Sequence, residues 1–223
     1  MTTITKAGSG RPKAGYFLAD GTRVPSVTTV LGRFKDSGGL IHWAWTMGRD
    51  GKDYREERDA AANAGTAAHA AVEAHLHGRP WDWLAVSEAI RGKAQASFEA
   101  FLEWESQTQL EVTQTELPLV SDAERFGGTF DAILIHGKRS IGDWKTSGAV
   151  YPEYLIQVAA YGRLWEETFP DQPITGGYHL LRFDKAYGDF SHKWWGELDA
   201  AWRAFLLLRE LYEIEKELKL RAK

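Results

Sequence analysis

The spacing of apolar residues changes twice along the chain, from a helical period to a strand period and back again. Residues 110–120 alternate between apolar and polar positions, as a half-buried strand does. Two apolar runs within 125–147 flank a tight turn and predict a hairpin. Further strands are expected at 174–184 and 189–195, so the second half of the chain is predicted to build a sheet.

Helical periodicity surrounds these strands. Apolar stripes predict long or medium helices at 41–47, 60–77, 86–107, 152–169 and 197–220. Near the N-terminus we expect a small hairpin at 16–24, followed by a short helix at 27–34 with Ser26 as its cap. Trp43 and Trp45 are expected to pack against neighbouring side chains.

The order of these elements predicts an α/β fold. Helices, three strands, a helix, two strands and a final helix form a mixed central sheet flanked by helices, with an N-terminal helical elaboration. We expect a flexible tail at 1–14 and a single domain at 15–223. Within that domain a helical part at 26–108 precedes a sheet core at 110–195 and a C-terminal helix at 197–220.

The hairpin within 125–147 carries the candidate chemistry. If the chain folds back about Gly137, Asp131 faces Asp143 and Thr129 faces Lys145. Facing side chains have Cβ atoms roughly 4.5–5.5 Å apart, and like charges at that distance are destabilising. A cation between the carboxylates, or a proton on one of them, would stabilise such a pair. Because Lys145 is two residues after Asp143, its side chain leaves the same face of the strand.

Apolar residues occupy both faces of this hairpin. We expect Phe130, Leu134 and Trp144 on one face, and Ile133 and Ile141 on the other. A strand that is apolar on both faces belongs in the middle of a sheet with helices on both sides.

Composition limits the kinds of site and partner. The net charge is −4, whereas proteins that coat nucleic acid are usually basic, so a nucleic-acid partner would need a local basic groove. No apolar run is long enough for a membrane span, and the polar start of the chain lacks the apolar segment of a signal peptide. The chain has no cysteine, which excludes disulfides and cysteine-ligated iron–sulfur clusters. A cytoplasmic location is expected.

The residue types of the hairpin suit phosphodiester hydrolysis. Carboxylate oxygens are hard ligands that Mg²⁺ and Mn²⁺ prefer. A metal between Asp131 and Asp143 could polarise a phosphate and generate hydroxide, while Lys145 holds the attacking water or balances charge in the transition state. A simpler interpretation stays open, in which Lys145 forms a salt bridge with the aspartates at the strand end.

Several segments together resemble a known family. Residues 128–131 (Gly-Thr-Phe-Asp) and 142–147 (Gly-Asp-Trp-Lys-Thr-Ser) resemble the core of the PD-(D/E)XK nuclease superfamily. Other segments resemble motifs of its RecB-like exonuclease branch, including small phage and mitochondrial exonucleases: Gln157 with Tyr161, residues 65–69 (Gly-Thr-Ala-Ala-His) and residues 25–31 (Pro-Ser-Val-Thr-Thr-Val-Leu). The resemblance covers about residues 25–165 and implies a restriction-endonuclease-like core.

This resemblance implies roles for individual residues. Asp131 and Asp143 would be metal ligands and Lys145 the catalytic lysine. His69 would be a further ligand, and Glu116 on the preceding strand would complete the acidic cluster. The metal would be Mg²⁺ or Mn²⁺, and the iron–sulfur cluster of many relatives has no ligands here.

Purely structural roles stay open for the candidate residues outside the hairpin. Gln157 and Tyr161 would support the site or contact a DNA phosphate, but they could simply pack. Ser26 and Thr28 could contact DNA or only cap a helix. His69 could instead pair locally with Glu73, one turn further along its helix.

The resulting hypothesis is a metal-dependent DNA exonuclease in recombination, repair or end processing. Its partners would be DNA ends or single strands, and a single-strand annealing or recombination protein, in a bacterial or phage-infected cell. Two alternatives are a structure-specific or site-specific endonuclease on the same fold, and a catalytically silent DNA-binding module.

Overall fold

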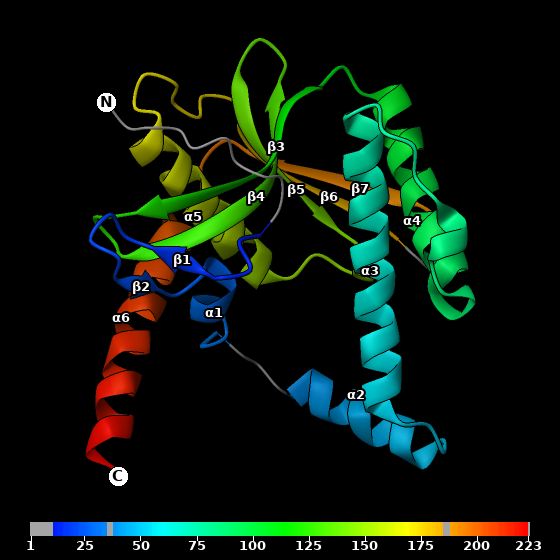
Figure 1. Cartoon of the computed structure of the whole chain (residues 1–223), viewed down its shortest axis with the longest axis horizontal. Helices are drawn as coiled ribbons and strands as arrows, with labels where there is room; N and C mark the ends of the chain where they lie inside the picture. Colours follow the sequence, from blue (N-terminus) through cyan, green and yellow to red (C-terminus); the bar gives the residue numbers. More distant parts are fainter. Residues whose placement is uncertain (1–10, 35–37, 185–187, 223) are drawn as a thin grey trace.

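A five-stranded mixed sheet forms the centre of the molecule in the computed structural model, which describes residues 11–34, 38–184 and 188–222 (Figure 1). The strands lie in sequence order, and only β5 and β6 pair in parallel. Their bounds are β3 Glu111–Ser121, β4 Phe126–Ile135, β5 Arg139–Lys145, β6 Gly177–Phe183 and β7 Phe190–Trp195. The predicted α/β class, with a mixed sheet flanked by helices and a helical N-terminal part, is confirmed.

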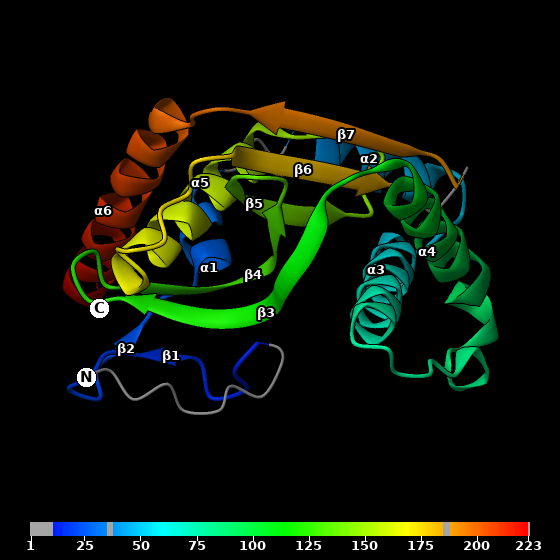
Figure 2. The same ribbon diagram turned by 90° about the horizontal axis from the view of Figure 1, so that it is seen from above.

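Helices cover both faces of this sheet. On one face, α1 (Val27–Leu31), α5 (Pro152–Thr168) and α6 (Asp199–Arg221) bury the larger core. On the other, α3 (Tyr54–Leu76) and α4 (Glu88–Gln107) bury a second, aromatic-rich core. Figure 2 shows α5 and α6 at one end of the molecule and α3 and α4 at the other. None of the described helices combines the length and apolarity that a membrane crossing needs.

The predicted hairpin register is confirmed along most of its length. Ile135 pairs with Arg139, Ile133 with Ile141, and the ladder ends one step later at Ala132 and Gly142. Gly137 has a φ of +70°, the left-handed conformation that the turn requires. Strand β5 is the central strand and β4 its neighbour, so the prediction that the hairpin lies inside the sheet is also confirmed.

One predicted side-chain face is wrong. Phe130 packs in the core of Ile133 and Ile141, whereas Leu134 and Trp144 lie in the opposite core. The cause is a break in the alternation at Asp131, where β4 does not pair regularly with β3. Opposite Asp131, the backbone of Glu116 has a φ of +50°, which interrupts the ladder.

The N-terminal part begins with a two-stranded hairpin, β1 (Tyr16–Phe17) and β2 (Arg23–Val24), followed by α1. Ser26 caps α1 as predicted, accepting a hydrogen bond from the Thr29 amide at 3.1 Å, but the helix ends at Leu31 rather than at 34. Of the predicted tail, residues 1–10 lie outside the described residues, as do 185–187 of the turn predicted between β6 and β7.

Helix α2 (Gly38–Arg49) departs from the expected packing. It has no buried residue, and Trp45 is 58% exposed, so Trp45 packs only on neighbours within its own helix, between the His42 ring and the Arg49 guanidinium, and does not join a core. Trp43 makes an edge contact with the Tyr54 ring. A single turn of 3-10 helix, η1 (Trp83–Ala85), completes the elements before α4.

Candidate metal centre

Three acidic residues stand in one row across β3, β4 and β5. Glu116 lies opposite Asp131, between the paired residues on either side of them in the β3–β4 ladder. Asp131 lies opposite Asp143, one step beyond the last pair of the β4–β5 ladder. Here the Trp144 amide donates to Oδ2 of Asp131 at 2.6 Å, so the carboxylate occupies the gap where the strands separate. The structure therefore brings the two predicted aspartates and Glu116 together.

The backbone at Glu116 is unusual for a strand. Its φ of +50° is in the left-handed region, which costs an L residue roughly 1–2 kcal/mol. Such outliers persist only where the surrounding structure enforces them, and they concentrate at functional sites. In this conformation the Glu116 carboxylate reaches the side chains of Asp131 and His69.

His69 comes to the row from α3. Close approach of this helix depends on Gly65, one turn earlier, because a Cβ there would lie 2.8 Å from Oγ1 of Thr146. Nδ1 of His69 is 4.0 Å from Oδ1 of Asp131. Burial and the neighbouring Lys145 lower the pKa of His69 to about 4. The imidazole is therefore neutral at physiological pH, the form that binds metals.

The structure does not pair His69 with Glu73, the alternative that the sequence left open. Oε1 of Glu73 instead accepts a hydrogen bond from Arg79 at 3.0 Å. His69 is left facing the acidic row.

These residues fit a divalent cation. Ligand atoms of His69, Glu116 and Asp131 all lie within 4.8 Å of one another, and no other described trio of histidine or acidic residues meets this condition. Two carboxylates and an imidazole are ligands that Mn²⁺ and Mg²⁺ accept. Asp143 lies outside this trio, although it was predicted as a ligand. Its side chain is 1% exposed and pairs with Lys145.

Lys145 is held in place from three directions. Its Nζ lies 2.5 Å from Oδ2 of Asp143 and donates to Oε1 of Gln157 at 3.1 Å. The ring of Tyr154 lies 4.8 Å from the same nitrogen, and Gln157 in turn donates to the Tyr161 hydroxyl at 2.8 Å. Burial opposes the charged form, but the carboxylates of Asp143 and Asp131 outweigh it and raise the Lys145 pKa.

Sequence reasoning missed Tyr154. It precedes Gln157 by three residues and Tyr161 by seven, a spacing that places all three on one helical face. This helical spacing could have identified Tyr154 from the sequence. With His69, Asp131, Lys145 and Gln157, Tyr154 lines an open cavity of about 370 Å³.

The surroundings of the acidic row disfavour ionisation of its three carboxyl groups. Burial and neighbouring acids raise the pKa of Glu116 to about 8. Burial raises the pKa of Asp143 to about 6, although Lys145 opposes the shift. Burial also raises the pKa of Asp131, again against Lys145. The three carboxylates thus face a single ammonium group.

Ser26 and Thr28 lie beside Glu116, on a cavity separate from the one lined by His69 and Lys145. Together with Glu116, Thr129 and Tyr161 they line a small cavity of about 180 Å³. Ser26 is buried in its capping role, while Thr28 is exposed. Both therefore adjoin the acidic row, although their hydrogen bonds are those of a helix cap.

A scan against protein-family models finds no match for this chain, and neither does a search of curated proteins. The resemblance to the PD-(D/E)XK superfamily therefore rests on the quoted motifs.

Proposed function

We propose that this protein is a Mg²⁺- or Mn²⁺-dependent nuclease that hydrolyses phosphodiester bonds in DNA, acting as an exonuclease. The observation that carries the proposal is the row of Glu116, Asp131 and Asp143 beside a neutral His69 and the Lys145 ammonium group. Hard oxygen ligands, an imidazole and a positioned ammonium group are the components that metal-assisted phosphodiester hydrolysis needs.

A plain salt bridge at the strand end explains only part of this arrangement. Lys145 pairs with Asp143 and neutralises one carboxylate. Glu116 and Asp131 remain close together without a cation of their own, and Glu116 is held in a strained conformation. A salt bridge between Lys145 and Asp143 requires neither that backbone conformation nor the convergence of an imidazole with two carboxyl groups, so the trio with His69 favours a metal site over a purely structural ion pair.

Chemistry at this site divides between the cation and the chain. A divalent cation held by His69, Glu116 and Asp131 would polarise the phosphate and lower the pKa of a bound water. Lys145, which stays charged, donates hydrogen bonds to a phosphate oxygen or to the attacking water and offsets negative charge in the transition state. Asp143, Gln157 and the Tyr154 ring fix the direction of its ammonium group.

End-labelled DNA incubated with Mg²⁺ or Mn²⁺ tests the proposal. Lys145→Ala and Asp131→Asn should each lower the cleavage rate by about 10²-fold or more, since each removes a group that acts on the reacting phosphate. Lys138→Ala, at the hairpin turn away from the acidic row, serves as the matched control and should cleave like the wild type. Equal rates in wild type and both site variants, or no cleavage with either metal, would refute the nuclease proposal.

Closed circular DNA tests the finer assignment. A strict exonuclease leaves it intact and degrades the same DNA after linearisation. Cleavage of the closed circle that depends on Lys145 would replace the exonuclease by an endonuclease on the same site. Mn²⁺ binding without cleavage of either DNA would identify a silent binding module.

A further inference from the structure

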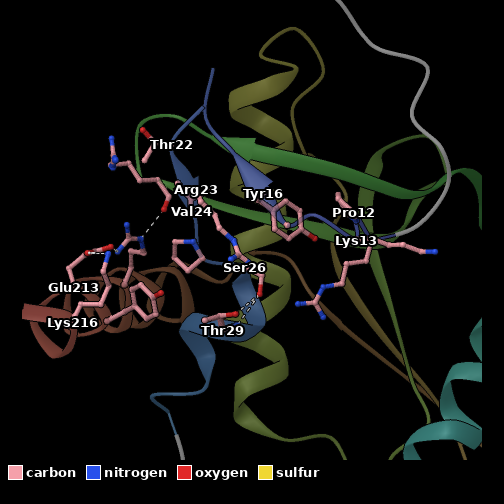
Figure 3. Close-up of a pocket in the computed structure, with 16 residues that line it drawn as sticks. Pro12, Lys13, Tyr16, Thr22, Arg23, Val24, Ser26, Thr29, Glu213 and Lys216 are labelled. Carbon is pink, nitrogen blue, oxygen red and sulfur yellow. Dashed lines mark hydrogen bonds and ion pairs between the residues drawn. The ribbon is translucent and has the colours of Figure 1, made fainter. Parts of the chain in front are cut away.

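A third, larger cavity lies between the β1–β2 hairpin and α6, and we call it the basic groove (Figure 3). Its volume is about 1100 Å³. Figure 3 shows Glu213 and Lys216 of α6 on one side and Tyr16 with the β1–β2 hairpin on the other. The groove is lined by cations from separate parts of the chain: Arg11, Lys13, Arg23, Arg125, Arg209 and Lys216.

The charge of this groove contrasts with that of the chain. Six cations line it against a single acid, Glu213, although the whole protein has a net charge of −4. Glu213 is shared between Arg209 at 2.8 Å and Lys216 at 3.2 Å, so it neutralises at most one of them. An acidic protein that concentrates cations in one cavity creates a local field for an anionic ligand.

Four of these cations form no salt bridge within the described residues, although Arg125 lies near enough to Asp20 to help lower the pKa of that carboxyl group. Arg11, Lys13, Arg23 and Arg125 are exposed, and none forms an ion pair with any residue in the described ranges. Arg209, by contrast, is buried. Its guanidinium donates to the Arg125 carbonyl at 3.1 Å, which fixes the floor of the groove.

The basic groove adjoins the small cavity on which Glu116 of the candidate metal centre lies. The small cavity beside Glu116 shares Arg11, Tyr16 and Ser26 with the basic groove. At this junction the Tyr16 hydroxyl is hydrogen-bonded to Oγ1 of Thr129 at 2.9 Å, two residues before Asp131. Glu116 of the acidic row and the cations of the groove therefore lie on neighbouring cavities with common walls.

We propose that the basic groove binds the sugar–phosphate backbone of a nucleic-acid strand whose reacting phosphate lies at the metal centre. This assignment rests on the proposed nuclease function. The groove is far larger than one phosphate group, and its cations come from four separate segments, so they match a repeating polyanion rather than a single anion. An acidic peptide shares the charge but not the phosphodiester linkage that the adjoining site is built to contact.

Charge reversal tests this assignment without catalysis. In EDTA, so that no cleavage occurs, binding of a labelled single-stranded oligonucleotide is followed by fluorescence anisotropy over a range of salt concentrations. The double variant Arg11→Glu/Arg23→Glu should bind at least tenfold more weakly. Its plot of log affinity against log salt should be shallower by about 1.4, since roughly 0.7 is lost for each single-strand phosphate contact.

Lys93→Glu/Lys193→Glu is the matched control. Both lysines are exposed and lie outside the groove, and the change in net charge is the same. Arg11→Gln/Arg23→Gln repeats the test without adding acidic groups, in case the first variant fails to fold. Selective weakening in the groove variants supports the proposal.

Equal weakening in the groove and control variants would overturn it. So would wild-type protein that binds poly-glutamate as tightly as the oligonucleotide. Because binding is measured in EDTA, the result is separate from the nuclease test. Absence of cleavage together with groove-dependent binding would reject the catalytic proposal alone and keep the groove as a nucleic-acid site.

Discussion

Glu116 is the residue where strand geometry, burial and charge conflict most strongly. Its left-handed backbone turns a carboxylate toward Asp131, and burial with neighbouring acids raises its pKa to about 8. In the metal-free protein this carboxyl group therefore keeps its proton at neutral pH. A cation that uses Glu116 as a ligand must displace that proton, so metal binding is coupled to pH.

Mn²⁺ affinity should consequently rise with pH until Glu116 loses its proton in the free protein. The expected rise is up to about tenfold per pH unit for each proton displaced, levelling off near pH 8. Glu116→Gln should bind Mn²⁺ more weakly and with a flatter pH profile, because the variant has no proton to displace at this position. Isothermal titration calorimetry across this range measures both. Parallel profiles for the two proteins would show that Glu116 is not a ligand.

At the level of single residues, local pattern predicted positions but not partners. The register about Gly137 correctly predicted the pairing from Ile135–Arg139 to Ala132–Gly142, and so predicted Asp131 next to Asp143, because a tight turn fixes the pairing of its strands. The choice of ligands depends on contacts between distant segments. Asp143 turns to Lys145 while Glu116 joins His69, and no spacing within a single strand contains that information.

Among the elements, β4 packs closely against β1 on one side and against α1 and α5 on the other. A Cβ on Gly127 would lie 2.3 Å from Cγ of Tyr16 in β1. A Cβ on Gly128 would lie 2.8 Å from Tyr161 of α5 and 2.9 Å from Val27 of α1. These two glycines let the N-terminal hairpin and α5 approach opposite faces of the strand that carries Asp131.

Gly128→Ala should therefore lower the free energy of unfolding by about 1–3 kcal/mol, the usual cost of overpacking a core. Gly92→Ala in α4 is the matched control. Nothing lies within 4 Å of its new Cβ, so this change should instead stabilise the protein by about 0.5–1 kcal/mol through helix propensity. Urea unfolding of the three proteins measures both. A Gly128→Ala midpoint at or above that of the wild type would contradict the packing described at β4.

Elements with strong local signals were predictable, and their packing was not. Ser26 caps α1 and Pro152 begins α5 as the sequence indicated, because both act through their own backbone neighbourhood. The wrong face for Phe130 arose from the irregular pairing opposite Glu116, a distortion imposed from the next strand. Trp45 is exposed because α2 packs mainly on α3 and buries none of its own residues, which the periodicity of α2 could not reveal.

The molecule as a whole separates two regions of opposite charge that share a border. The acidic row lies between α3 and α5, and the basic groove lies beyond it between β1–β2 and α6. A cation bound to the first region would reduce its repulsion toward a phosphate chain in the second. The overall charge of −4 gives no indication of this division, since it sums over both regions.

Stability of the whole protein should respond to the cation through the acidic row. In the metal-free state burial raises the pKa of Asp131, so the folded form holds its proton to higher pH than the unfolded form does. The contribution of Asp131 to stability is then lost as pH rises above the pKa that Asp131 has in the unfolded chain. Asp131→Asn removes this loss, and its side-chain oxygen can still accept the hydrogen bond from the Trp144 amide. The metal-free variant should consequently melt at or above the wild-type temperature at neutral pH.

Mn²⁺ should stabilise the wild type much more than Asp131→Asn. At about 100 times its dissociation constant it stabilises the wild type by about 2.7 kcal/mol, or about 5–10 °C in melting temperature for a chain of this length. Asp131→Asn should show little of this shift because it lacks a ligand, while Asp122→Asn, at an exposed turn, should retain it in full. Differential scanning calorimetry with and without Mn²⁺ separates the cases. Equal metal-induced shifts in wild type and Asp131→Asn would show that the cation binds elsewhere and that the acidic row is not its site.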